Sequence, residues 1–271
     1  MNPLSNNIHV QYQGYLDTPL LWKDHAILGI EQLHVISLKT PTFMEGIPDN
    51  LVLGKRVEQF VFKELEQSDS IEVLLKNTQV QNGKTTIGEI DCMLKQNDRP
   101  IHLEIVYKFY LYDPDMGENE IDCWIGPNRN DTLLKKLSKL KDKQFPLIHN
   151  NHTRPILDKL DLDASEVLQR VRFKGQLFTP YDTDVAFKLL NQDCLKGFYI
   201  HVSKINQFSD STFYIPAKAD WLLEIQTDVE WMIYGEFKKS ITAMIDRKRA
   251  PLCWIKFPDG KLQKFFVVWW S

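Results

Sequence analysis

The stretch GEIDCMLKQNDRPIHLEIVYKFYLY, which spans residues 88–112, decides the fold of this chain. Two runs with alternating apolar and polar residues flank a turn at residues 97–100, and this pattern predicts an antiparallel hairpin. Successive side chains of a strand point to opposite faces, so Leu103 lies on one face of the second strand, and Glu104 and Lys108 lie on the other. The first face is expected to be core, and the second, polar face is a candidate site.

A helix and a further strand are predicted before this hairpin. Apolar residues in the run LVLGKRVEQFVFKELEQ, residues 51–67, recur at helical spacing and leave the opposite face charged. Apolar and polar residues then alternate from Ile71 onward, and Asn82-Gly83 is a typical two-residue hairpin turn. Residues 50–112 are therefore predicted to form one helix followed by three antiparallel strands.

The remaining segments are predicted to be mostly helical, with a last hairpin at the C-terminal end. A lysine-rich helix is expected after the candidate caps Asn130 and Asp131. Periodicity predicts further helical stretches at residues 14–38, 164–171 and 225–245, and Pro19 is expected to split the first of them or to start a helix there. The run CWIKFPDGKLQKFFVVWW is predicted to turn back on itself at Pro258-Asp259-Gly260.

These elements predict an α+β fold whose core is a mixed sheet flanked by helices. Residues 1–49 are expected to form an N-terminal helical segment packed on the core, which residues 50–150 build. Residues 151–271 are expected to form a helical and aromatic C-terminal α+β part, either of the same domain or as a small second domain.

The composition is that of an ordinary globular protein. The chain has 271 residues, of which 43% are hydrophobic and 25% charged, and its net charge is −3. This charge excludes a broadly basic nucleic-acid coat but leaves room for a local basic groove. The four cysteines form no CxxC pair, so they predict neither a zinc site nor a redox motif and fit a reducing compartment.

No targeting or membrane segment is visible in the sequence. The N-terminus lacks a basic region followed by an apolar run, and no apolar stretch reaches the roughly 18 residues that a membrane span needs. We therefore expect a cytoplasmic protein without a membrane partner. The sequence also lacks P-loop, GxGxxG and GxSxG patterns, which leaves nucleotide hydrolysis, dinucleotide binding and serine-hydrolase chemistry unsupported.

Four residues of the predicted helix and hairpin form a candidate catalytic group: Glu58, Asp91, Glu104 and Lys108. Hard divalent cations prefer carboxylate oxygens, so Asp91 and Glu104 are predicted to bind Mg²⁺, or Mn²⁺, from two neighbouring strands. Lys108 is predicted to orient or deprotonate an attacking water, and Glu58 to support the metal or the lysine. A bound metal lowers the pKa of water and neutralises charge on a phosphate.

This arrangement resembles the core of the PD-(D/E)XK nuclease superfamily, in which GEID is followed by a Glu on the next strand. The resemblance implies a restriction-endonuclease-like α-β-β-β-α-β core that holds Mg²⁺ and cuts phosphodiester bonds. Glu58 matches the acidic residue of the first core helix, Asp91 the metal-binding aspartate, and Glu104 the Glu of the E-x-K element.

The chain also resembles, more narrowly, a bacterial domain-of-unknown-function family, number 1853. The segments GEID, HLEIVYKFYLY and WIGPNRNDTLLKKLSKLKDKQFPL carry this resemblance. It is specific from about Gly88 to Leu147, with weaker similarity toward the C-terminus.

One position departs from the superfamily pattern. Val106 stands where the pattern has its lysine, and the lysine is Lys108, roughly 6.6 Å farther along the strand. A strand bulge or a long side chain can close part of this gap. Two alternatives to a nuclease therefore stay open: a member that binds nucleic acid without cutting it, and a protein-interaction scaffold that keeps the fold without the site.

Two roles are possible for each of two residues near the candidate catalytic residues. Glu89 is either a second metal ligand or the partner of a lysine, and His102 is either a ligand or a hydrogen-bonded strand residue. Lys135, Lys136, Lys139 and Gln144 follow the core strands, and we predict that they contact a phosphate backbone. Nucleic acid is the expected partner, with a protein partner as the alternative. The sequence leaves open DNA or RNA, exonuclease or endonuclease, and the oligomeric state.

Overall fold

The structure is a computed structural model that describes residues 8–35, 47–48 and 51–270. The chain divides into two compact units, each built from segments that are separate in the sequence. Unit 1 comprises Met1–Leu21, Lys108–Leu134 and Gly175–Ser271, and unit 2 comprises Trp22–Tyr107 and Lys135–Lys174. Each unit thus takes segments from all three of the ranges 1–49, 50–150 and 151–271.

The strands of unit 2 follow the hydrogen-bonded order β1-β2-β3-β5. Their bounds are β1 (Ile71–Asn82), β2 (Thr85–Gln96), β3 (Arg99–Tyr112) and β5 (Leu168–Pro180), the last two of which continue into unit 1. Both predicted hairpins are confirmed, because β1, β2 and β3 pair antiparallel in succession. The second turn consists of Asn97 and Asp98, whose φ angles of 49° and 64° suit a two-residue hairpin turn.

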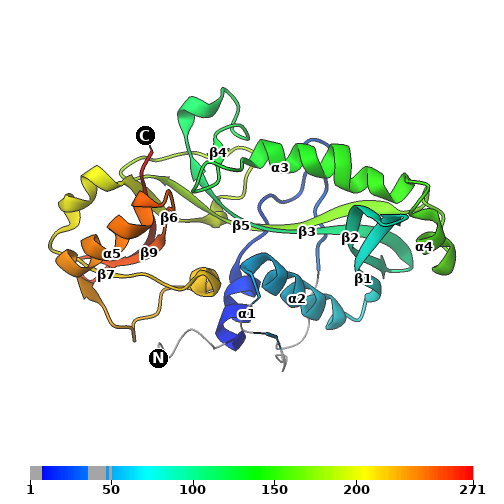
Figure 1. The fold of residues 1–271 in the computed structure, drawn as a ribbon, viewed down its shortest axis with the longest axis horizontal. Coiled ribbons are helices and arrows are strands. Elements are labelled where there is room, and N and C mark those ends of the chain that lie inside the picture. The colour runs from blue at the N-terminus through cyan, green and yellow to red at the C-terminus, as the bar shows by residue number, and fades with distance from the viewer. Residues whose placement is uncertain (1–7, 36–46, 49–50, 271) are drawn as a thin grey trace. The chain divides into compact units, whose positions relative to one another are not determined.

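Two helices accompany these strands. The predicted first helix is confirmed as α2 (Leu53–Glu66), which buries Val57, Phe60 and Leu65. The lysine-rich helix is α3 (Leu133–Lys139), which continues without a break into a π-helical turn, η2 (Leu140–Gln144), and a 3-10 turn, η3 (Phe145–His149). In Figure 1, β2 and β3 run between α2 and α3.

Between Leu53 and Pro180 the longer elements follow in the order α2, β1, β2, β3, α3 and β5, which does not conflict with the predicted α-β-β-β-α-β succession. Shorter elements interrupt it, among them β4 (Trp124–Ile125) and α4 (Arg154–Lys159). The fold is α+β with a mixed sheet flanked by helices, as predicted.

Unit 1 holds the parallel part of the sheet. Here β5 pairs with β6, and β6 pairs with β10, both in parallel, while β9, β7 and β8 extend the sheet in antiparallel pairs. The bounds are β6 (Leu195–His201), β7 (Thr212–Tyr214), β8 (Met232–Ile233), β9 (Leu252–Lys256) and β10 (Leu262–Val268). The predicted final hairpin is confirmed as β9 and β10.

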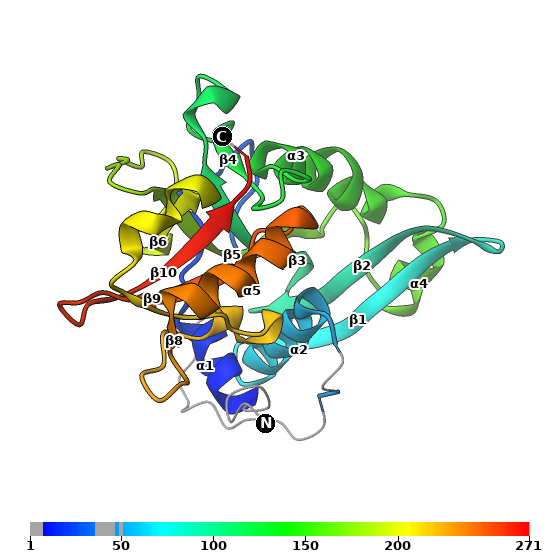
Figure 2. The same cartoon turned by 60° about the vertical axis from the view of Figure 1, so that its left-hand side comes forward.

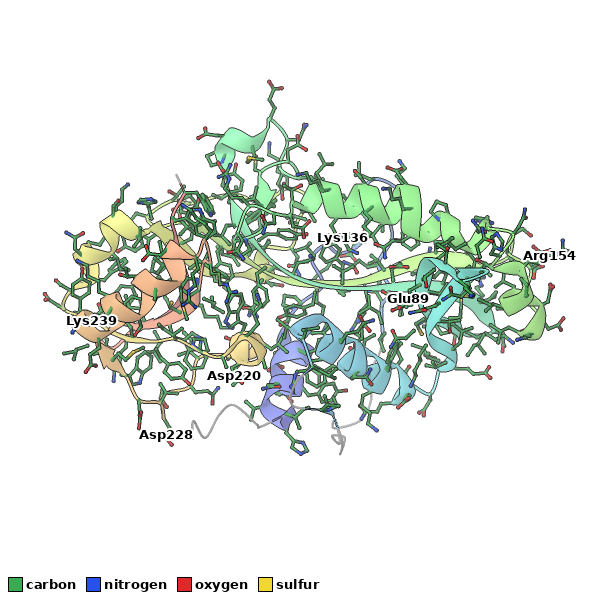
Figure 3. All side chains as sticks on the ribbon, viewed as in Figure 1. Glu89, Lys136, Arg154, Asp220, Asp228 and Lys239 are labelled. Atoms are coloured by element: carbon green, nitrogen blue, oxygen red, sulfur yellow. The ribbon has the colours of Figure 1, made fainter. Side chains whose placement is uncertain are left out.

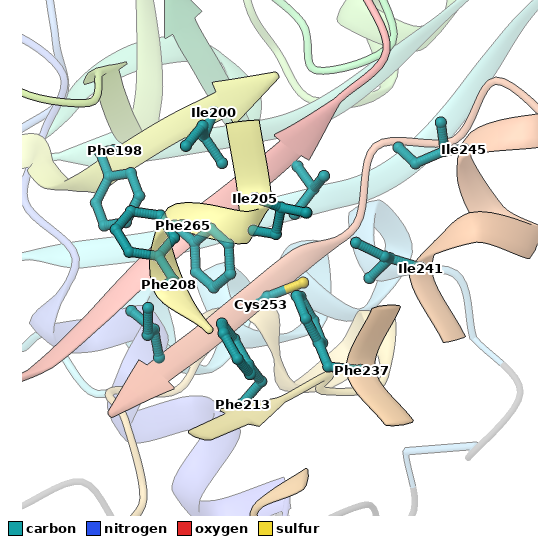
Figure 4. Packing of buried hydrophobic residues seen from close by; sticks show 12 residues of the cluster. Phe198, Ile200, Ile205, Phe208, Phe213, Phe237, Ile241, Ile245, Cys253 and Phe265 are labelled. Carbon is teal, nitrogen blue, oxygen red and sulfur yellow. The ribbon is translucent and has the colours of Figure 1, made fainter. Parts of the chain in front are cut away.

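An aromatic core fills unit 1. Helix α5 (Tyr234–Asp246) lies beside β10 in Figure 2 and packs Phe237 and Ile241 against the sheet. Figure 4 shows this cluster, in which the rings of Phe213 and Phe237 stack with centroids 4.1 Å apart. The aromatic residues of the C-terminal part are therefore core, and strands contribute more to this part than the sequence predicted.

Three predicted helices are wrong in extent or kind. Helix α1 (Ile8–Asp17) ends before Pro19, and residues 18–35 form turns and isolated bridges in place of the helix predicted over 14–38. Positive φ angles at Asp24, Leu28 and Gly29 exclude a continuous helix there. Residues 36–38 lie outside the described residues.

The helix predicted at residues 164–171 is also wrong, because strand β5 begins at Leu168. The helix predicted over 225–245 begins only at Tyr234. Across the described ranges, no helix combines the length and the apolar character needed to cross a membrane.

Candidate functional site

Asp91 and Glu104 come together on adjacent strands of unit 2. The pairing of Cys92 with Leu103 sets Asp91 of β2 opposite Glu104 of β3, and directly opposed residues of an antiparallel pair share a face. The two side chains are within hydrogen-bonding reach of each other. The Asp91 carboxylate also accepts a hydrogen bond from the backbone N–H of Ile105, at 2.9 Å. Local pairing thus fixes both carboxyl groups.

Burial changes the acidity of this pair. The Glu104 side chain is 0% exposed, and burial raises its pKa to about 7, although the positive charge of Lys136 opposes this rise. Burial, followed by the charge of Glu104, raises the pKa of Asp91 to about 6. Two carboxylates this close repel each other, so the pair favours a shared proton or a bound cation near neutral pH.

His102 completes the buried polar face of β3. Its side chain is 0% exposed, and its Nε2 lies 3.3 Å from Glu104 Oε1. The angles do not make this contact a hydrogen bond, and neither ring nitrogen nor Glu104 Oε1 has a hydrogen-bond partner. The ring packs edge-on against Phe145, and burial lowers the pKa of His102 to about 4. The reading of His102 as a hydrogen-bonded strand residue is therefore wrong.

Gln144 and Lys136 reach the pair from the helix that follows the strands. The Gln144 side-chain amide donates to Glu104 Oε2, and its oxygen accepts a hydrogen bond from Lys136 Nζ at 2.8 Å. Gln144 is the last residue of the π-helical turn η2, and such turns re-aim side chains within a helix. The charge of Lys139 also lowers the pKa of Glu104, whereas Lys135 points to the exposed surface.

Helix α2 borders the site from another direction. Lys55 Nζ contacts Glu58 Oε2 at 2.8 Å and Glu89 Oε1 at 2.9 Å, so Glu89 is the partner of a lysine. Burial raises the pKa of Glu58; Lys55 opposes this, and the charges of Asp91 and Glu89 add to it. Glu58 and Asp91 are thus close enough to repel each other. Figure 3 marks Glu89 on its strand and Lys136 beneath α3.

Lys108 has a carboxylate partner of its own. Its Nζ lies 2.6 Å from Asp131 Oδ2, and both residues belong to unit 1. The lysines whose charge lowers the pKa of Asp91 are Lys136 and Lys55, both of unit 2. The structure therefore brings Glu58, Asp91 and Glu104 together and pairs Lys108 elsewhere.

Lys55 was not among the residues predicted from the sequence to form the site. Its spacing of three residues from Glu58 on a predicted helix was the available signal, because side chains at i and i+3 are neighbours on a helix surface. Nothing in the local sequence indicates its second partner, Glu89, which lies 34 residues away.

The donor set fits a hard cation better than a soft one. Within the described part of the chain, no three His, Cys, Asp or Glu side chains are grouped so as to hold a metal ion. Asp91 and Glu104 would be the two protein ligands, and Mg²⁺ commonly keeps several waters besides one or two carboxylates. The buried Glu104 Oε1, which lacks a hydrogen-bond partner, is the atom that a cation would satisfy.

One of three comparisons with known proteins found a family for this chain. A family model described as "Domain of unknown function (DUF1853)" matches residues 31–268. A comparison with curated proteins found no match, and a comparison with solved structures found none either. The matched range contains Glu58, Asp91, Glu104 and the helix that bears Lys136. The chain therefore belongs to the DUF1853 family, whose function its description leaves unknown.

Proposed function

We propose that this protein is a metal-dependent phosphodiesterase that cuts DNA or RNA and binds one Mg²⁺ or Mn²⁺ through Asp91 and Glu104. The observation that carries the proposal is that the buried carboxyl group of Glu104 and the partly buried one of Asp91 lie within hydrogen-bonding reach of each other. Such a pair is electrostatically costly unless a proton or a cation lies between the two groups. A cation bound between the two carboxylates would offset this cost.

The element order supports the same proposal. Helix α2, strands β1 to β3, helix α3 and strand β5 follow the succession expected of the PD-(D/E)XK nucleases. Glu58, Asp91 and Glu104 stand at the positions that match the acidic residues of that superfamily. We therefore propose a nuclease-like core.

We propose Lys136 for the role that the sequence pattern gives to a lysine on β3. Gln144 ties the Lys136 ammonium to Glu104, whereas Lys108 pairs with Asp131. An ammonium held there would orient a water or a phosphate oxygen and stabilise the charge that develops on the phosphate. The metal, when bound, would lower the pKa of the attacking water.

Lysines on the exposed side of the same helix would hold the nucleic acid. Lys135, Lys139, Lys141 and Lys143 are exposed along α3 and η2. Phosphate contacts of this kind position the backbone without reading its sequence. These lysines fit a substrate that is recognised through its phosphate backbone.

A member that binds nucleic acid without cutting it is the second candidate. The ion pair between Lys108 and Asp131 favours it, because that contact holds the only lysine of β3 away from a catalytic role. This reading predicts binding that survives Asp91→Ala and weakens with salt, because phosphate contacts release counterions.

Thermal melting with and without Mg²⁺ and Mn²⁺ tests the metal. We expect both ions to raise the melting temperature of the wild type, since a ligand that binds only the folded state stabilises it. Asp91→Asn and Glu104→Gln should lose the rise, and Glu72→Gln, an exposed position on β1, should keep it. Absence of any rise in the wild type at millimolar metal would overturn the proposal.

Cleavage of labelled single-stranded DNA, double-stranded DNA and RNA tests the reaction. We expect metal-dependent cleavage of at least one substrate, reduced at least roughly a hundredfold by Lys136→Ala, the scale of a general-acid or electrostatic group. Metal binding and nucleic-acid binding without cleavage would favour the second candidate.

A further inference from the structure

The ammonium of Lys55 sits on a cluster of carboxylates beside the candidate metal ligands. It contacts Glu58 and Glu89 at 2.8 and 2.9 Å, and its positive charge also lowers the pKa of Asp91. Glu58 comes from the same helix, whereas Glu89 and Asp91 are two residues apart on β2 and therefore share a face. One nitrogen atom thus joins carboxylates from two elements.

Without this ammonium the cluster would carry uncompensated negative charge. The Glu58 side chain is 13% exposed, and the charges of Asp91 and Glu89 already raise its pKa. Glu89 is 32% exposed. Clustered carboxylates in a partly buried site attract a hard cation, whose preferred ligands are carboxylate oxygens. Lys55 already supplies a cation at this place, tethered to the chain.

We propose that Lys55 takes the place of a second divalent cation, so that the site holds one metal ion. This inference rests on the proposed function, because the one ion is the ion at Asp91 and Glu104. The Lys55 side chain is 44% exposed, so a substitution there should leave the core of unit 2 intact. Its removal would open the place between Glu58 and Glu89 to a second ion.

The number of bound ions distinguishes this role from that of an ordinary surface ion pair. An exposed ion pair contributes little to stability, and its loss would not change how many ions bind. A tethered ammonium that occupies a cation site would change the number itself. Mn²⁺ alone serves as the probe, with the bound ions counted by calorimetry and by electron paramagnetic resonance.

We expect one Mn²⁺ per chain in the wild type and two in Lys55→Gln. Lys55→Arg keeps the charge and should bind one, as should Lys63→Gln, a change of another lysine on the same helix. Adding Glu89→Gln to Lys55→Gln should return the number to one. Lys55→Met gives the same test if Lys55→Gln does not fold.

The outcomes separate this inference from the proposed function. One ion in both the wild type and Lys55→Gln would overturn the inference and leave the site at Asp91 and Glu104 standing. Two ions in the wild type would also overturn it. No ion in the wild type but one in Lys55→Gln would overturn the site at Asp91 and Glu104 and, with it, the inference that Lys55 replaces a second ion. No ion in either protein would overturn both.

Discussion

At the scale of single residues, Glu104 ties the stability of the fold to pH. Burial raises its pKa from an ordinary 4.5 to about 7, so between these values the folded state holds a proton that the unfolded state has released. The contribution of Glu104 to the free energy of unfolding must therefore fall as the pH rises through this window; Asp91, whose pKa is raised to about 6, adds to the fall, and His102, whose pKa is lowered to about 4, opposes it. The expected decrease is on the order of 2–3 kcal/mol, or several degrees of melting temperature.

Glu104→Gln should remove the part of the decrease that comes from Glu104, because the amide does not ionise. The measurement is thermal melting in a chelator between pH 4.5 and pH 8, with Glu72→Gln as the control on an exposed strand position. The difference in stability between the wild type and Glu104→Gln should change with pH through this window, and a constant difference would mean that burial does not raise the pKa of Glu104.

Gln144 should tune the same titration. Its amide hydrogen bond lowers the pKa of Glu104, so Gln144→Leu should raise that pKa further above its ordinary value. Carboxyl carbon NMR measures the shift directly. Gln81→Leu, on the exposed part of β1, is the matched control, and an unchanged Glu104 titration in Gln144→Leu would argue against the contact.

The sequence predicts some of these residues and misses others for a physical reason. Asp91 and Glu104 follow from strand alternation and a short turn, which are local properties. Lys108 satisfies the same alternation, yet its partner Asp131 lies 23 residues away. The contact of Gln144 with Glu104 depends on a π-helical turn, and no sequence pattern predicted that turn.

At the scale of elements, Gly197 determines whether β6 and β10 can pair. A Cβ at this position would lie 1.9 Å from the backbone oxygen of Lys264, its partner on β10. Backbone cannot move aside as a flexible side chain can, so Gly197→Ala should destabilise the protein by about 3 kcal/mol, the upper end of the usual cost of overpacking. Urea denaturation measures the effect.

Gly54→Ala provides the opposite control. A Cβ there meets nothing within 4 Å, and the residue lies in the first turn of α2. Alanine has the higher helix propensity, so this change should stabilise the protein by up to about 1 kcal/mol. Similar effects at both glycines would show that the close approach of β10 does not set the cost.

Hairpins were predictable at this scale, whereas several helices were not. The turns of β1, β2 and β3 carry residues suited to positive φ, and alternation fixes the pairing. Strand β5 is buried along most of its length, from Val171 to Thr179, so it lacks the alternation that marks a half-exposed strand. The run before it therefore looked helical.

At the scale of the whole molecule, the two units explain why the domain boundaries could not be predicted. Each unit is assembled from distant segments, and the chain passes between them after Leu21 and then inside β3, α3 and β5. Composition and linkers mark boundaries only where a unit is continuous in the sequence. No such signal exists for a boundary that falls inside a strand.

At the same scale, measurements of nucleic-acid binding should show which basic surface of the molecule contacts the phosphates. The net charge of −3 does not favour a polyanion, so any affinity must come from a basic surface such as the exposed side of α3. Lys135→Gln with Lys139→Gln should weaken binding to a labelled single strand. It should also reduce the slope of log K against log salt by roughly 0.7 for each phosphate that the variant no longer neutralises.

The matched control is Lys238→Gln with Lys239→Gln, which removes two exposed lysines from α5 in unit 1. Fluorescence anisotropy in a chelator, over a range of salt concentrations, compares the two double variants without cleavage. If the salt slope falls only in the α5 variant, the nucleic acid binds to unit 1. It would also remove the lysines of α3 from the proposed path of the backbone, because counterion release follows the phosphates that the protein neutralises.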